Sequence, residues 1–70
     1  NPSSSDIFLR SSENILKVEL YDLRGRKIIQ QNNLNKFETQ FNVEHLKEAI
    51  YILNVYTKEK IIVKKIVKKN

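Results

Sequence analysis

One short stretch decides the fold class: residues 16–25, which read LKVELYDLRG. Its first half places Leu16, Val18 and Leu20 in alternation with polar residues, and a period of two is typical of a β-strand with one buried face. Its second half, from Asp22 to Gly25, fits a type I turn with Asp at the first position and Gly at the fourth. Gly25 is the chain's single glycine. Glycine at this place supplies the positive φ of a G1 bulge, so we expect a tight hairpin.

Similar strand and turn patterns recur on both sides of this hairpin. Further candidate strands cover residues 7–10, 27–31, 37–43 and 50–57, and turn-forming residues occupy 32–35 and 57–60. The stretch 50–57 is apolar in both phases, which predicts a central strand covered on both faces. Residues 44–49 are compatible with one helical turn. We therefore predict an all-β fold, a small immunoglobulin-like antiparallel β-sandwich of six to seven short strands.

The last segment, residues 61–69 (IIVKKIVKK), is compatible with two structures. Ile62, Val63, Ile66 and Val67 would share one face of a basic amphipathic helix. Every apolar residue here is β-branched, however, and β-branched residues favour strands. We expect a strand with a bulge near Lys64 and Lys65, because Lys65 would otherwise interrupt its apolar face.

The net charge of +5 arises entirely in the last thirteen residues. Residues 1–57 contain seven basic and seven acidic side chains, whereas residues 58–70 contain six lysines and Glu59 alone. A neutral body with a basic terminal strand suggests a segment that a partner recognises. A solvated edge strand protected by lysines against aggregation is the plain structural alternative.

Composition argues against several classes of function. The chain has 70 residues, no cysteine and one histidine, His45, so a disulfide, a thiolate metal site or a histidine-based catalytic triad is not expected. The eight acidic residues are scattered and lie mostly on polar strand phases, which is typical of solvated faces. We expect no enzyme activity, no cofactor and no metal. No apolar run approaches the length of a transmembrane segment.

Nucleic-acid binding is a possibility that the basic end raises. Small barrels that bind nucleic acid mix lysines and stacking aromatic residues on one surface. Here the tyrosines belong to earlier strands and the lysine-rich segment has no aromatic residue. We therefore expect no nucleic-acid partner.

Three stretches together resemble the C-terminal sorting domain (type A-like) of the bacterial type IX, or Por, secretion system. They are Asn1-Pro2 with residues 7–9, residues 18–27 (VELYDLRGRK), and residues 41–68 from FNVEHL through AIYILNV to KKIVK. Their order and spacing carry the resemblance more than any one of them. One departure is Ala49, where the family usually has glycine; alanine fits there only with a negative φ.

The resemblance implies a role as a secretion signal. Residues 1–5 would tether an upstream cargo, with Ser3, Ser4 and Ser5 exposed to processing, and residues 6–70 would form the sandwich domain. The cargo would pass through the periplasm and reach the outer membrane, the cell surface or the medium. The implied partners are the outer-membrane translocon and a sortase-like peptidase that removes the domain.

We assign provisional roles to individual residues on this basis. Asp22 and Gly25 form the structural turn, and Tyr51, Leu53 and Val55 belong to the core. Recognition by the translocon is assigned to the last residues: Lys64, Lys65, Ile66, Val67, Lys68, Lys69 and Asn70.

Two other functions and one assembly state stay open from the sequence. The domain is alternatively an immunoglobulin-like accessory module that binds carbohydrate or protein, for which Tyr21 and Tyr56 side by side on the surface would be evidence. A bare structural spacer is the third reading. A short first strand on a tether also allows a strand-exchanged homodimer.

Overall fold

Five antiparallel strands make up the computed structural model, which describes residues 6–69. The strands are β1 (Asp6–Asp22), β2 (Lys27–Gln31), β3 (Lys36–Asn42), β4 (Ala49–Thr57) and β5 (Ile61–Lys68). This part of the chain contains no helix. The all-β prediction is confirmed, but the described residues contain five strands and not six or seven.

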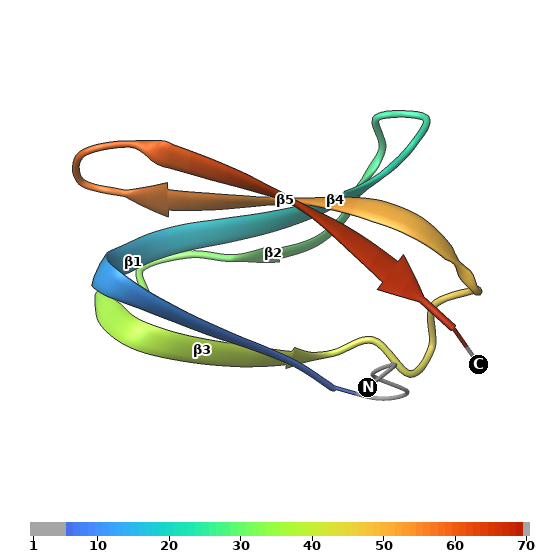
Figure 1. Ribbon diagram of the computed structural model, residues 1–70, viewed down its shortest axis with the longest axis horizontal. Helices are drawn as coiled ribbons and strands as arrows, with labels where there is room; N and C mark the ends of the chain where they lie inside the picture. Colours follow the sequence, from blue (N-terminus) through green and yellow to red (C-terminus); the bar gives the residue numbers. More distant parts are fainter. Residues whose placement is uncertain (1–5, 70) are drawn as a thin grey trace.

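The count is lower because β1 is one strand of 17 residues where two were expected. Its first half pairs with β3, from Asp6 opposite Asn42 to Arg10 opposite Glu38. Its second half pairs with β2 on one side and β4 on the other. The register against β3 breaks between Arg10 and Ile15, and Figure 1 shows β1 bending there, so that its two halves belong to different layers.

The strand order β2-β1-β4-β5 leaves two outer strands in the larger layer, with β3 attached to the first half of β1. Beside β2, the side chain of Gln31 accepts a hydrogen bond from Thr39 Oγ1 (2.8 Å) and donates one to the Gln40 carbonyl (3.3 Å), both on β3. These side-chain contacts join the two layers on that side. On the other side, β5 pairs with β4 alone among the described strands.

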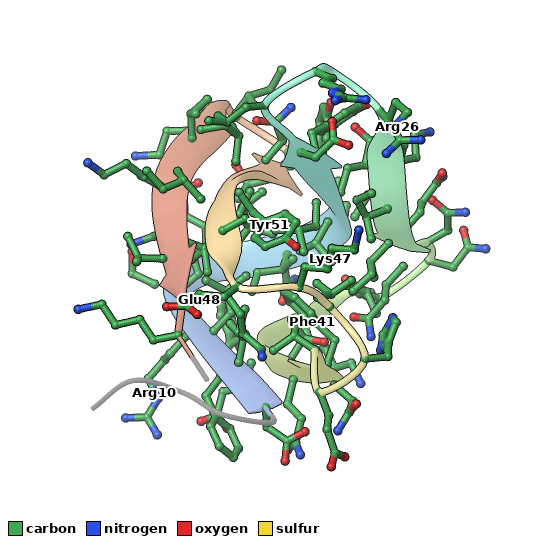
Figure 2. All side chains as sticks on the ribbon, turned by 90° about the vertical axis from the view of Figure 1, so that its right-hand side faces the viewer. Arg10, Arg26, Phe41, Lys47, Glu48 and Tyr51 are labelled. Atoms are coloured by element: carbon green, nitrogen blue, oxygen red, sulfur yellow. The ribbon has the colours of Figure 1, made fainter. Side chains whose placement is uncertain are left out.

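The core lies between the layers and receives side chains from β1, β3 and β4 and from Val43, which follows β3 directly. Its buried members are Leu9, Ile15, Val18, Leu20, Phe41, Val43, Tyr51, Leu53 and Val55. Figure 2 shows Tyr51 from β4 and Phe41 from β3 in this interior space. The prediction that Tyr51, Leu53 and Val55 are core residues is confirmed.

A β-bulge in β1 changes which residues enter the core. The register against β4 shifts between Ile15 and Lys17, and an extra residue in one strand reverses the inward and outward faces. Ile15 is therefore fully buried beside Val18, whereas Leu16, which the alternation placed inside, is 38% exposed. Phe37, four residues before the buried Phe41, is 53% exposed near the start of β3.

The prediction that residues 50–57 are covered on both faces is wrong for the outer face of β4. β4 is central in its layer, as predicted, but only its inner face is covered. Ile50 is exposed and Ile52 is half-buried, because no second layer packs outside them.

The predicted turn at Asp22–Gly25 is confirmed in detail. The Gly25 N–H donates to the Asp22 carbonyl (3.0 Å), the Asp22 N–H donates to the Arg26 carbonyl (3.0 Å), and Gly25 has φ +88°. The side chain of Asp22 accepts further hydrogen bonds from the N–H groups of Arg24 and Arg26, each at 2.9 Å. Turn and G1 bulge together set the register of the β1–β2 hairpin.

The segment before β4 is a turn and not a helix. Its hydrogen bond runs from the Leu46 N–H to the Val43 carbonyl (2.9 Å). Ala49 is not among the described residues with positive φ, which are Asn33, Asn35 and Gly25. The alanine therefore fits its position without backbone strain.

Substitution of Gly25 tests the turn. Gly25→Ala should lower the free energy of unfolding by about 1 kcal/mol, because an alanine side chain disfavours positive φ. An added Cβ would meet no atom within 4 Å, so the cost is conformational and not steric. Urea denaturation of the purified domain measures it.

Gly25→Asn is the matched control for this experiment. Asparagine tolerates the left-handed region, as Asn33 and Asn35 do in this chain, so its loss should be smaller than that of alanine. Equal stability of all three proteins would contradict the bulge.

Candidate functional site in the terminal edge strand

The lysine-rich segment forms β5, an edge strand. Its register with β4 runs without interruption from Tyr56–Ile61 to Ala49–Lys68. The strand prediction is confirmed, and the expected bulge near Lys64 and Lys65 is wrong. An unbroken register means that side chains alternate strictly between the two faces of the strand.

The backbone of β5 presents its free hydrogen-bonding groups at every second residue. In the preceding turn, the Thr57 N–H donates to the Lys60 carbonyl (2.9 Å), which makes these residues a hydrogen-bonded pair. Hydrogen-bonded and non-hydrogen-bonded pairs alternate along an antiparallel ladder. The N–H and C=O groups that point away from β4 are therefore those of Ile61, Val63, Lys65 and Val67.

The candidate recognition residues differ in accessibility. Lys64, Lys65, Val67 and Lys69 are exposed, and Ile66 is half-buried. Lys68 points inward and is only 3% exposed. Asn70 and the tether Ser3, Ser4 and Ser5 lie outside the described residues.

The buried Lys68 and Tyr51 hold the turn that precedes β4. The Lys68 Nζ donates to the Leu46 carbonyl (3.4 Å), and the Tyr51 hydroxyl donates to the Lys47 carbonyl (2.8 Å). Figure 2 shows Tyr51 of β4 near Lys47, which belongs to this turn. The end of β5 is thus part of the folded body, and Lys68 has a structural task that the sequence did not indicate.

A second cluster, which the sequence did not reveal, surrounds Glu19 on the outer face of the larger layer. Glu19 is 4% exposed. Its Oε1 accepts hydrogen bonds from the hydroxyls of Tyr56 (2.7 Å) and Tyr21 (3.0 Å), and its Oε2 lies 3.2 Å from Lys27 Nζ and 3.7 Å from Lys17 Nζ. Glu19 is therefore not on a solvated face, as the alternation suggested. Only the pairing of three strands brings these side chains together.

These contacts shift the acid–base properties of the cluster. The pKa of Glu19 falls from its ordinary value of 4.5 to about 2, chiefly because the Tyr56 hydroxyl stabilises the carboxylate; burial opposes this, and Lys27, Tyr21 and Lys17 reinforce it. The hydrogen bond to Glu19 raises the pKa of Tyr56, and burial does the same for Tyr21. Glu19 is thus ionised at any physiological pH.

Tyr21 and Tyr56 lie close together, as the alternative function of a carbohydrate- or protein-binding module would require. Both hydroxyls, however, donate to the same Glu19 oxygen. The Lys17 ammonium lies 4.4 Å from the centre of the Tyr56 ring and covers one face of it. A ring and hydroxyls occupied in this way do not form an open stacking surface, so the pair stabilises the sheet.

The position of the single histidine and two features of the described residues complete the description of the site. His45 is exposed in the turn before β4. Residues 6–69 contain no group of three or more histidine or acidic side chains that could hold a metal ion. No helix in the described region is long and apolar enough to cross a bilayer.

Comparison with known families identifies the chain. The family model described as "Secretion system C-terminal sorting domain" matches residues 1–69. The chain belongs to this family. No match is found among curated proteins or among solved structures.

A sorting domain of this family is the C-terminal signal of cargo that the type IX system secretes or displays on the cell surface. The resemblance identified from the sequence is thereby confirmed, as is the role as a C-terminal sorting signal of type IX secretion cargo that it implied. The family is a secretion signal and is not known as catalytic. In this sorting domain, β5 combines exposed lysines, exposed β-branched side chains and an edge position in the sheet.

The Glu19 cluster predicts how stability depends on pH. Because the folded-state pKa lies below the ordinary value, ionised Glu19 contributes stability above about pH 4.5, and this contribution is lost as the pH falls toward 2. Glu19→Gln should therefore melt at a lower temperature than the wild type near pH 7, and the difference should shrink below about pH 3. Thermal melts across this range measure it.

Glu38→Gln is the control, because Glu38 pairs with Arg10 on an exposed surface where both side chains are mostly accessible. That variant should melt within a degree or so of the wild type. A constant difference between Glu19→Gln and wild type at every pH would contradict the account.

Proposed function

We propose that β5 and residues 64–70 are the element of this sorting domain that the outer-membrane translocon recognises. A strand of the receptor adds to the free edge of β5. Main-chain hydrogen bonds then supply affinity, and side chains at alternate positions supply selectivity. The exposed lysines speed the encounter with an acidic receptor, an effect that weakens with salt.

One observation carries the proposal: β5 is an edge strand whose outward N–H and C=O groups have no partner strand among residues 6–69. Free edges of this kind are hazards that proteins usually cover or shorten. This edge spans the eight residues of β5. An unpaired edge is more easily explained when a partner uses it.

The rest of the pathway follows from the family role. The cargo crosses the periplasm, and a sortase-like peptidase removes the domain at or upstream of Ser3–Ser5. The fold is of the immunoglobulin-like sandwich type, for which the two layers of antiparallel strands around one core give support. A strand-exchanged homodimer stays a prediction.

Proline at position 67 tests strand addition. Val67→Pro removes one outward N–H while leaving the β4–β5 hydrogen bonds intact, and proline is accepted on edge strands in such positions. Export of a fluorescent reporter fused to the 70 residues should fall by about tenfold in a cell with the type IX system. Reporter in the periplasm and in the medium is quantified.

Val67→Ala is the control, because it shortens the same side chain and keeps the N–H. It should lose clearly less export than Val67→Pro, because it affects only the side chain and not the main-chain hydrogen bond. Melting of both purified domains checks the fold. A deletion of residues 67–70 is less informative, since it also removes the buried Lys68. Full export of a folded Val67→Pro domain would refute strand addition at this edge.

A further inference from the structure

The outer face of the β4–β5 hairpin is unusually apolar for an exposed surface. We define the β4–β5 outer face by the cross-strand pairs Tyr56–Ile61, Asn54–Val63, Ile52–Lys65 and Ile50–Val67. Val63 is 63% exposed, Ile61 57% and Val67 47%. Exposed apolar residues scattered singly need no explanation, but a contiguous patch indicates an interaction site.

Lys65 lies in the middle of this apolar face. It pairs with Ile52 across the ladder and stands between Val63 and Val67 along β5. A bulge would have turned Lys65 away from this face. The register is unbroken, so Lys65 interrupts the apolar face. A charge at the centre of an apolar patch is costly to cover unless the covering surface carries the opposite charge.

The charge of Lys65 is also available, unlike those of the other lysines on this side of the sheet. Lys17 and Lys27 are ion-paired with Glu19. Lys65 has no ion pair within residues 6–69. The β2–β1 half of the face thus satisfies its charges internally, and the β4–β5 half leaves one cation unmatched.

We propose that the occupant is a strand of an acidic protein with the pattern apolar-x-acidic-x-apolar, added to the edge of β5. This rests on the proposed function and specifies the partner. The outward backbone groups of Val63, Lys65 and Val67 bind the strand. Because side chains alternate, its acidic residue lies beside Lys65 on the outer face, and its apolar residues lie beside Val63 and Val67.

Charge argues for this occupant over two others. A second copy of the chain would bring lysine-rich strands together edge to edge, and like charges in contact disfavour association. A membrane surface attracts lysines, but interfacial binding also relies on Trp and Phe. The chain has no Trp, and none of its three Phe residues lies in β4 or β5.

Neighbouring lysines provide a matched test in the reporter fusion. Lys65→Glu places the wrong charge on the outer face, whereas Lys64→Glu makes the same change in net charge on the opposite face of the same strand. Lys65→Glu should reduce export by about tenfold or more, and Lys64→Glu and Lys65→Arg by about twofold or less. Val63→Thr, which retains β-branching, should also reduce export. Melting temperatures confirm that each variant folds.

The outcomes distinguish the acidic pairing with Lys65 from strand addition at the edge of β5, on which it rests. Equal losses in Lys64→Glu and Lys65→Glu would mean that net charge alone matters, and would overturn the inference. Full export of Lys65→Glu while Val67→Pro is blocked would overturn the acidic pairing and leave edge addition intact. Full export of both would refute edge addition as well.

Two further measurements decide between occupants. Sedimentation of the purified 70-residue chain should show no association that depends on Val63. A dimer that Val63→Thr dissociates would assign the face to a second copy and overturn the acidic partner. Co-sedimentation with phosphatidylglycerol vesicles should show no difference between Lys65→Glu and Lys64→Glu. Vesicle binding lost only in Lys65→Glu would assign the face to a membrane and overturn the protein partner.

Discussion

The arrangement of the whole molecule depends on the hydrogen bonds of β1. This strand pairs with β3 through its first half and with both β2 and β4 through its second. One chain segment therefore belongs to both layers, and the core closes between them without a disulfide, because the chain has no cysteine. The bulge at residues 15–17 makes this possible, because it turns Ile15 inward beside Val18 after the bend.

The position of β5 follows from this arrangement. The second half of β1 is flanked by β2 and β4, and β5 joins the layer beside β4, where it becomes an edge. Its end is nevertheless anchored, since Lys68 is buried and contacts the Leu46 carbonyl. An edge that is fixed in place but unpaired along its outer side is suited to strand addition, because little ordering entropy remains to be lost on binding.

Charges on the outer face are divided between structure and recognition. Glu19 contacts two lysines and two tyrosines, and these contacts lower its pKa, so that its carboxylate is ionised at neutral pH. Lys65 is left on an apolar surface without a counterion in the described chain. Glu19 on β1 has its charge satisfied, and Lys65 on β5, one strand beyond β4, does not. This contrast is consistent with β5 as the proposed binding element of the sorting domain.

The sequence by itself determined the class of fold, the Asp22–Gly25 turn, the core of β4 and the family, because these depend on local periodicity, on one glycine and on ordered motifs. It also placed the positive charge on the last strand. Only the tertiary structure decided that two expected strands are one, that Leu16 faces outward, that Lys68 is buried and that Glu19 is enclosed. These features depend on a bulge and on cross-strand neighbours, and pairing between distant segments is not encoded in the alternation of any single strand.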